Sequence, residues 1–78
     1  MERVFFDSNT AGEGGYWLCL PLSLADLDQI ADKHDGMRVL LCMPKELELQ
    51  AELFYDAARE LWVGRPIEGA VRLLDNSP

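Results

Sequence analysis

The chain has 78 residues, of which seven are basic and fourteen acidic, so its formal net charge is −7. This length fits one domain, and a chain so short buries only about 60% of the surface that its unfolded state exposes. Nucleic-acid binding requires clustered lysine and arginine, whereas the basic residues here are scattered along an acidic chain. The same charge opposes contact with an anionic membrane surface. We therefore expect neither nucleic acid nor membrane among the partners.

Two cysteines, Cys19 and Cys42, lie inside apolar, strand-like runs. In such surroundings a reduced thiol behaves as a small, buried hydrophobic side chain, which is the state we expect. The alternative is a disulfide between the two cysteines, if the two strands are neighbours. The first residues lead directly into a strand pattern and have no features of a signal peptide. The longest uncharged run, residues 14–25, is interrupted by Pro21 and is too short to span a bilayer. We expect a protein of the reducing cytoplasm.

The first predicted strand is short, residues 3–6, and a loop rich in turn-forming residues follows over residues 7–15. The second strand, residues 16–20, ends at Pro21, which cannot donate a hydrogen bond to a neighbouring strand. The loop contains three glycines, at positions 12, 14 and 15, which are free to adopt positive φ angles. A phosphate-binding loop would also need a lysine and a following helix. We interpret this segment as the loop of a hairpin.

One helix is predicted, beginning at Ser23 and ending at Gly36. Ser23 and Asp26 have the spacing of a capping box, in which side chains satisfy the free N–H groups of the first turn. Apolar residues recur at helical spacing and form a single stripe: Leu24, Leu27, Ile30 and Ala31. We expect this stripe to cover one face or one end of the strands.

Residues 36–65 carry the pattern of three antiparallel strands, at residues 36–43, 46–56 and 60–65. The first is apolar at nearly every position, which is typical of a strand covered on both faces. In the second, apolar and polar residues alternate, and this period of two indicates one buried and one solvated face. The expected buried face holds Leu47, Leu49, Ala51, Leu53 and Tyr55.

A turn at residues 66–69 and a last strand at residues 70–74 follow, and residues 75–78 are expected to be frayed. The fold class is therefore mainly β with one helix (α+β), in the order β-β-α-β-β-β-β, with five or six antiparallel strands in a single domain. Two arrangements fit this order. The one we expect is a small SH3-like or Sm-like barrel, with bends at Gly64 and Gly69. The alternative is an open antiparallel sheet with the helix packed on one face.

Part of this pattern resembles a known family. Residues 36–64, with Tyr55-Asp56 before a turn and Leu61-Trp62-Val63 after it, look like the first motif of Sm-like barrels. Ile67-Glu68-Gly69 is similar to their second motif, although Glu68 replaces the basic residue that normally precedes the glycine. The resemblance covers about half of the chain and implies a small barrel. RNA binding of the Sm-like kind is opposed by the acidic charge.

The candidate catalytic and metal-binding groups fit a surface role. The helix carries several aspartates and the single histidine, His34, but Ile30 occupies a position where a calcium loop needs a ligand. His34 suits the carbonyl groups at the helix end. Glu48 and Glu52 share a face, yet nothing apolar is obliged to surround them and raise their pKa for acid–base catalysis. We predict no enzyme activity, no catalytic residue, no metal ion and no cofactor.

The aromatic residues are the most informative. If the turn near residues 57–59 has three residues, Phe54 and Trp62 lie on the same outer face of neighbouring strands. A two-residue turn would instead pair Leu53 with Trp62. Exposed aromatic rings rimmed by acidic residues are typical of a protein interface. Coverage by the helix would make both rings part of the core.

We therefore predict a small, acidic, non-enzymatic interaction module that self-associates as a homodimer or a larger oligomer. It would bind a protein partner through an aromatic and acidic sheet face or through a strand edge. The predicted binding residues are Trp17, Phe54, Tyr55, Trp62, Glu48 and Glu52. An alternative is a binding protein for a small cationic or apolar ligand, held between helix and sheet near Trp17, Tyr55 and Trp62. An Sm-like RNA binder is the third hypothesis.

Overall fold

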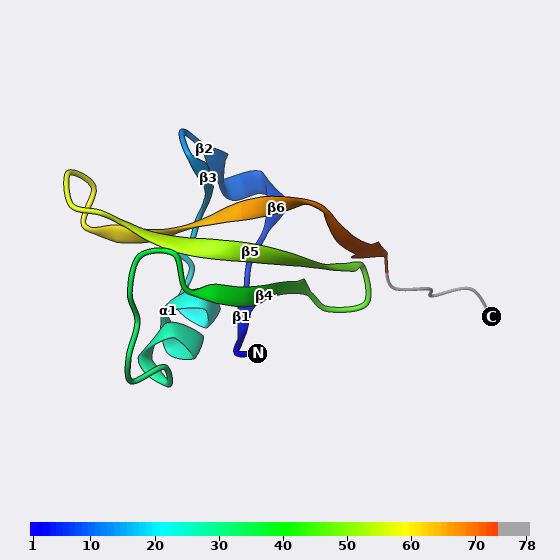
Figure 1. The fold of residues 1–78 in the computed structure, drawn as a ribbon, viewed down its shortest axis with the longest axis horizontal. Coiled ribbons are helices and arrows are strands. Elements are labelled where there is room, and N and C mark those ends of the chain that lie inside the picture. The colour runs from blue at the N-terminus through cyan, green and yellow to red at the C-terminus, as the bar shows by residue number, and fades with distance from the viewer. Residues whose placement is uncertain (74–78) are drawn as a thin grey trace.

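The structure is a computed structural model that describes residues 1–73, with side chains described up to Gly69. In chain order its elements are β1 (Arg3–Phe5), the 3-10 helix η1 (Ser8–Thr10), β2 (Ala11–Gly12), β3 (Gly15–Trp17), α1 (Pro21–Asp28), β4 (Arg38–Met43), β5 (Leu47–Asp56) and β6 (Leu61–Leu73) (Figure 1). The predicted class, mainly β with one helix, is confirmed for the described residues. The predictions for residues 74–78 lie outside them.

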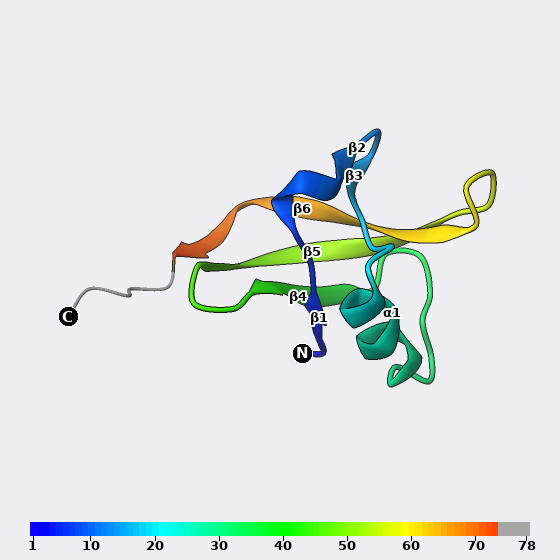
Figure 2. The same cartoon turned by 180° about the vertical axis from the view of Figure 1, so that it is seen from behind.

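The strands form one mixed sheet in the order β1-β4-β5-β6-β3-β2. As predicted, β4, β5 and β6 are successive antiparallel neighbours, and β3 and β2 extend the sheet in the same antiparallel manner. β1 departs from the prediction because it is parallel to β4. A parallel pair needs a long crossover connection. Here the chain leaves β1, crosses to β2 and β3 at the opposite edge, and returns through α1 to β4 (Figures 1 and 2).

The glycine-rich loop therefore does not join the first two predicted strands as a hairpin. It contains η1, capped by Asp7, whose side chain accepts a hydrogen bond of 2.8 Å from the Asn9 backbone N–H. The short hairpin of β2 and β3 follows, with Gly12 opposite Gly15. The Trp17 indole lies directly over Gly12, where an added Cβ atom would overlap the ring. Glycine is required at this position to let the indole approach.

The predicted barrel is not confirmed, because the sheet stays open between its edge strands β1 and β2. The far edge of β1 is occupied by α1 instead of by another strand. Ser23 Oγ donates to the Phe5 carbonyl at 2.6 Å, and Asp26 Oδ2 accepts from the Phe5 N–H at 2.8 Å. These side chains satisfy the backbone groups that a further strand would use. The sheet consequently ends at β1.

The hydrophobic core lies on one face of the sheet, which we call the inner face. α1 and the segment that follows β1 lie over this face, toward the viewer in Figure 2. Buried apolar side chains from every layer meet there: Val4, Phe6, Leu18, Leu27, Ile30, Val39, Leu41, Leu49, Ala51 and Leu53. The predicted alternation of β5 is thus confirmed at its centre. The opposite, outer face holds side chains such as Leu40 and Cys42 that are half-buried, so β4 is not fully covered on both faces as predicted.

α1 is shorter than predicted, and the predicted apolar stripe is buried only in part, at Leu27 and Ile30. The helix begins at Pro21 with Leu20 as N-cap, so Ser23 lies within the helix and is not its cap. Ser23 and Leu27 are buried, whereas Leu24 is 49% exposed. The backbone of β1 supplies the reason, because the Phe5 carbonyl needs a hydrogen-bond donor and Ser23 is the residue that can provide one.

β6 is one long strand where a turn and a separate strand were predicted. Leu49 of β5 is opposite Val71, but Ala51 is opposite Pro66, so β6 contains extra residues that form a bulge. Gly69 takes a φ angle of +79° within it. The turn-forming residues therefore interrupt the pairing without reversing the chain. Gly64, the other predicted bend, instead makes room for the Leu41 side chain, which an added Cβ would approach to 2.7 Å.

The hydrogen bond between Ser23 and Phe5 yields a testable prediction. We expect Ser23→Ala to lower the free energy of unfolding by about 1–3 kcal/mol, because it leaves a buried carbonyl without a donor. Urea denaturation followed by circular dichroism measures the change. Ser8→Ala, at an exposed position, is the control and should change stability by less than about 0.5 kcal/mol. Equal effects of the two substitutions would contradict the role assigned to Ser23.

Candidate functional site

The register of the β5–β6 hairpin determines where the aromatic side chains lie. The turn has four residues, 57–60, and it places Tyr55 opposite Trp62 and Phe54 opposite Val63. Directly opposed residues of an antiparallel pair point to the same face. Phe54 therefore lies on the outer face and Trp62 on the inner face. The prediction that these two rings share an outer face is wrong, because it assumed a shorter turn.

Trp62 belongs to the margin of the core. Its ring makes an edge-to-face contact with Tyr55, with the centroids 5.2 Å apart. Trp62 is half-buried and packs against the core, whereas Tyr55 at the end of the hairpin is 46% exposed. The interpretation of Trp62 as a core residue thus fits its position better than a place on a binding surface.

Trp17 joins Phe54 on the outer face. β3 pairs with β6 so that Trp17 is opposite Val63, and Val63 is in turn opposite Phe54 on β5. The three residues form an apolar row across β3, β6 and β5. Val63 is buried at the centre of this row, while Trp17 and Phe54 are half-buried.

An arginine stacks on each of the two rings. The Cζ atom of Arg59 lies 4.7 Å from the centre of the Trp17 ring, and that of Arg65 lies 4.4 Å from the centre of the Phe54 ring. A guanidinium group is attracted to the face of an aromatic ring and stacks on it as a flat plate. We call Trp17, Phe54, Val63, Arg59 and Arg65 the aromatic–arginine cluster.

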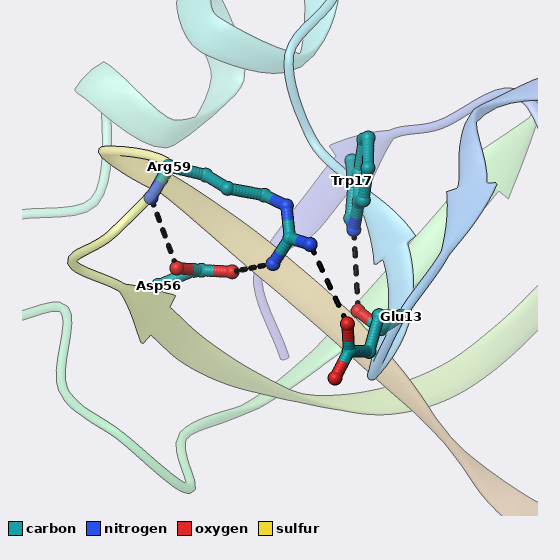
Figure 3. A network of polar contacts seen from close by, with 4 residues as sticks. All are labelled: Glu13, Trp17, Asp56 and Arg59. Carbon is teal, nitrogen blue, oxygen red and sulfur yellow. Dashed lines mark hydrogen bonds and ion pairs between the residues drawn. The ribbon is translucent and has the colours of Figure 1, made fainter.

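Arg59 is held in place by two acidic residues (Figure 3). Asp56 Oδ2 accepts from Arg59 Nη1 at 2.7 Å, and Asp56 Oδ1 accepts from the Arg59 backbone N–H at 3.0 Å. Arg59 Nη2 also lies 3.5 Å from Glu13 Oε2, and Trp17 Nε1 donates to the Glu13 carbonyl at 3.2 Å. The hydrogen bonds from Arg59 hold the pKa of Asp56 below its usual value. This network connects the β5–β6 turn to the β2–β3 hairpin.

A depression of about 260 Å³ lies at the cluster and is also lined by Glu13, Gly14, Tyr55 and Asp56. Cavities that enclose small molecules are usually larger, about 300–1,000 Å³. A depression of this size suits a single side chain of a larger partner. Carboxylates and guanidinium groups both line it, so the wall carries charges of both signs.

The predicted acidic residues, Glu48 and Glu52, lie on the outer face, and each has arginine neighbours. Glu48 is only 8% exposed and forms an ion pair with Arg3. Glu52 is half-buried and stands between Arg38 on β4 and Arg65 on β6. The predicted aromatic and acidic face is therefore an aromatic and arginine face. Arg59, Arg65 and Val63 were missed because the register, which aligns them with Trp17 and Phe54, is not readable from one sequence.

The sheet edges offer little backbone for pairing with a partner. β3 covers β6 only at Val63 and Gly64, so within residues 1–73 the later part of β6 has β5 on one side alone. The Trp62 carbonyl points toward β3, where it accepts from the Leu18 N–H. Alternate residues of a strand present their backbone groups to the same side, so Pro66 faces this edge. Proline has no N–H, and the bulge beyond it distorts the strand further, which are two means of blocking edge pairing.

The predicted small-ligand site does not form one pocket. Its three residues are divided between the two faces of the sheet, with Trp17 on the outer face and Tyr55 and Trp62 on the inner face.

Both cysteines are free thiols. Cys42 is half-buried, and Cys19 is exposed although it was predicted to be buried. Within residues 1–73, no three histidine, cysteine or acidic side chains gather as a metal site requires. The one α-helix found there, α1, is not of the length and apolar character needed to cross a membrane.

Comparisons with known proteins found no protein similar to this chain. No family model, no curated protein and no solved structure matches this chain.

The pairing of Asp56 with Arg59 predicts a specific pH dependence. A carboxyl group with a lowered pKa in the folded state stabilises the fold above its unfolded pKa of about 3.9. That contribution is lost as the pH falls through the lowered value. In an NMR titration of the side-chain carboxyl carbons, we expect the Asp56 midpoint to lie below 3.9 and to rise in Arg59→Gln.

The control for this titration is Glu13→Gln, which removes the weaker partner of Arg59 and should leave the Asp56 midpoint nearly in place. An Asp56 midpoint that does not respond to Arg59→Gln would show that the ion pair does not form in solution.

Proposed function

We propose that this protein is a small, non-enzymatic interaction module that binds a protein partner through the aromatic–arginine cluster. The observation that carries the proposal is the row of Trp17, Val63 and Phe54 across three strands, with an arginine on each outer ring. This row lies on the sheet face opposite the core, which α1 does not cover. The side chains are therefore available to a partner.

The composition of the cluster favours a protein partner. Tryptophan and arginine dominate the residues whose removal most weakens protein interfaces, and phenylalanine is enriched in interface cores. Binding normally costs side-chain entropy, because long side chains lose rotamer freedom at the interface. Here the stacking on Trp17 and the bonds to Asp56 already hold Arg59 in one position. A partner would meet a surface that is ordered before binding.

The sheet edges also favour the outer face over a strand edge as the surface that contacts the partner. Pro66 and the bulge of β6 oppose strand addition on one side, and Ser23 and Asp26 occupy the backbone of β1 on the other. We therefore assign partner binding to the outer face. The depression beside Phe54 would receive one side chain of the partner.

We include a second copy of the chain among the partners, as a homodimer or larger assembly. The sequence is 49% hydrophobic, and several large apolar side chains are exposed in the single chain, among them Leu22, Leu24 and Tyr55. Sedimentation velocity over a hundredfold concentration range tests this part of the proposal. A strict monomer throughout would remove self-association and leave a different protein as the partner.

Two alternatives have less support. A cationic ligand at Trp17 would have to displace Arg59, which already occupies a face of the indole. RNA binding would require a protein of charge −7 to approach a polyanion.

The proposal predicts that removal of a ring from the outer cluster weakens binding, whereas removal of an exposed ring elsewhere does not. Immobilised wild-type protein, Phe54→Ala and His34→Ala are compared for capture of partners from a cell extract, followed by titration of the purified partner. We expect Phe54→Ala to weaken binding at least about tenfold, as removal of an interface anchor does. His34 is exposed and does not line the depression, so His34→Ala should bind like the wild type.

Unfolding curves of both variants control for loss of structure. Trp62→Ala serves as a further reference, because it should lower stability by about 2–3 kcal/mol through lost packing against the core. Equal binding by Phe54→Ala and His34→Ala would refute the assignment of the interface to the outer face.

A further inference from the structure

A second cavity lies away from the aromatic–arginine cluster, where the first turn of α1, strand β1 and the β4–β5 turn meet. Its volume is about 520 Å³, within the range of about 300–1,000 Å³ that is usual for small-molecule sites. It shares no lining residue with the cluster. Its lining residues are Arg3, Val4, Phe5, Leu22, Asp26, Cys42, Pro44 and Lys45.

The wall of this cavity is mostly apolar. Leu22 is 61% exposed, an unusual state for a leucine beside a cavity, and a bound apolar group would cover it. Phe5 and Cys42 line the same cavity and are half-buried. Burial raises the pKa of the Cys42 thiol, so this group stays neutral at pH 7 and adds no charge to the wall. The wall therefore suits an alkyl or aryl group.

The polar groups of the cavity differ in whether they already have partners. Asp26 accepts a hydrogen bond from the Phe5 N–H through Oδ2, and Arg3 forms an ion pair with Glu48. No hydrogen bond or ion pair joins the Lys45 ammonium to any residue whose side chain is described, residues 1–69. Lys45 thus offers the cavity a cationic donor, which is complementary to an anionic acceptor.

The backbone at Lys45 adds an independent observation. The Glu46 N–H donates to the Met43 carbonyl at 3.0 Å, which makes residues 43–46 a β-turn with Pro44 second and Lys45 third. Lys45 has a φ angle of +65°. When proline is the second residue of a turn, a positive φ at the third residue marks a type II turn, and glycine is the favoured residue at that third position. The chain carries a lysine here at a conformational cost, and this lysine lines the cavity.

We propose that this cavity binds a small amphipathic carboxylate, with its apolar part against Leu22 and Phe5 and its carboxylate on the Lys45 ammonium. The proposal is independent of the protein-binding function assigned to the outer cluster. It also differs from the cationic-ligand site that the sequence predicted near Trp17, Tyr55 and Trp62. The ligand has the opposite charge, and none of those three residues lines this cavity.

The test uses octanoate as the probe, with octan-1-ol and octylamine as probes of the same chain length and different charge. Each is titrated into ¹⁵N-labelled full-length protein. We expect octanoate to shift the amide signals of Phe5, Leu22 and Cys42 in a saturable manner and to bind more tightly than octan-1-ol. Octylamine should bind more weakly than either. No saturable shift at these residues, or tighter binding of octylamine, would overturn the proposal.

Two variants locate the carboxylate. Lys45→Gly suits the turn, so it should keep or raise the melting temperature while reducing octanoate affinity about tenfold, as expected for loss of a charged hydrogen bond. Octan-1-ol affinity should not change. Arg38→Gln removes the same charge from an exposed site that does not line the cavity, and it should leave octanoate binding intact. Equal losses in the two variants would mean that octanoate responds to net charge and not to this site.

Discussion

The pairing of Tyr55 with Trp62 across the β5–β6 hairpin is the constraint on which the candidate interface depends. A shift of one residue would move every side chain of one strand to the opposite face. With the observed register, Leu53 and Trp62 face the core, while Phe54, Val63 and Arg65 face outward. β3 then adds Trp17 to the same face through its pairing with Val63. The composition of the proposed binding surface is thus a consequence of one four-residue turn.

The ways in which the sheet ends explain why a face, and not an edge, is left for binding. Ser23 and Asp26 of α1 occupy the backbone of Phe5 in β1, so the helix acts as the terminating neighbour of the sheet. At the other side, β2 is only two residues long, and Pro66 interrupts the free edge of β6. The same placement of α1 brings Leu22 beside Phe5, which creates the second cavity. The position of α1 therefore both ends the sheet at β1 and forms one wall of this cavity.

The net charge of the chain and the charged groups at its two surfaces favour different kinds of partner contact. The whole chain carries a net charge of −7, which argues against polyanionic partners at long range. At close range the outer face presents Arg59 and Arg65, and the second cavity presents Lys45. At these surfaces, a charged group attracts a ligand or partner more strongly when it is not already paired with another side chain. Asp56 and Glu48 are paired with arginines, whereas the Lys45 ammonium is not paired with any side chain described in residues 1–69.

The sequence alone determined the class of the fold, the alternation of Leu49, Ala51 and Leu53 in β5, and the meander of β4, β5 and β6, because these follow from local periodicity and short connections. It also identified Trp17 and Phe54 as binding candidates. Only the tertiary structure decided that β1 runs parallel to β4, that Ser23 is buried in place of Leu24, and that Trp62 lies on the inner face. Each of these depends on contacts between residues far apart in the chain. Hydrophobic periodicity indicates that a strand has two faces, but turn length and long-range hydrogen bonds decide which residues of neighbouring strands share one.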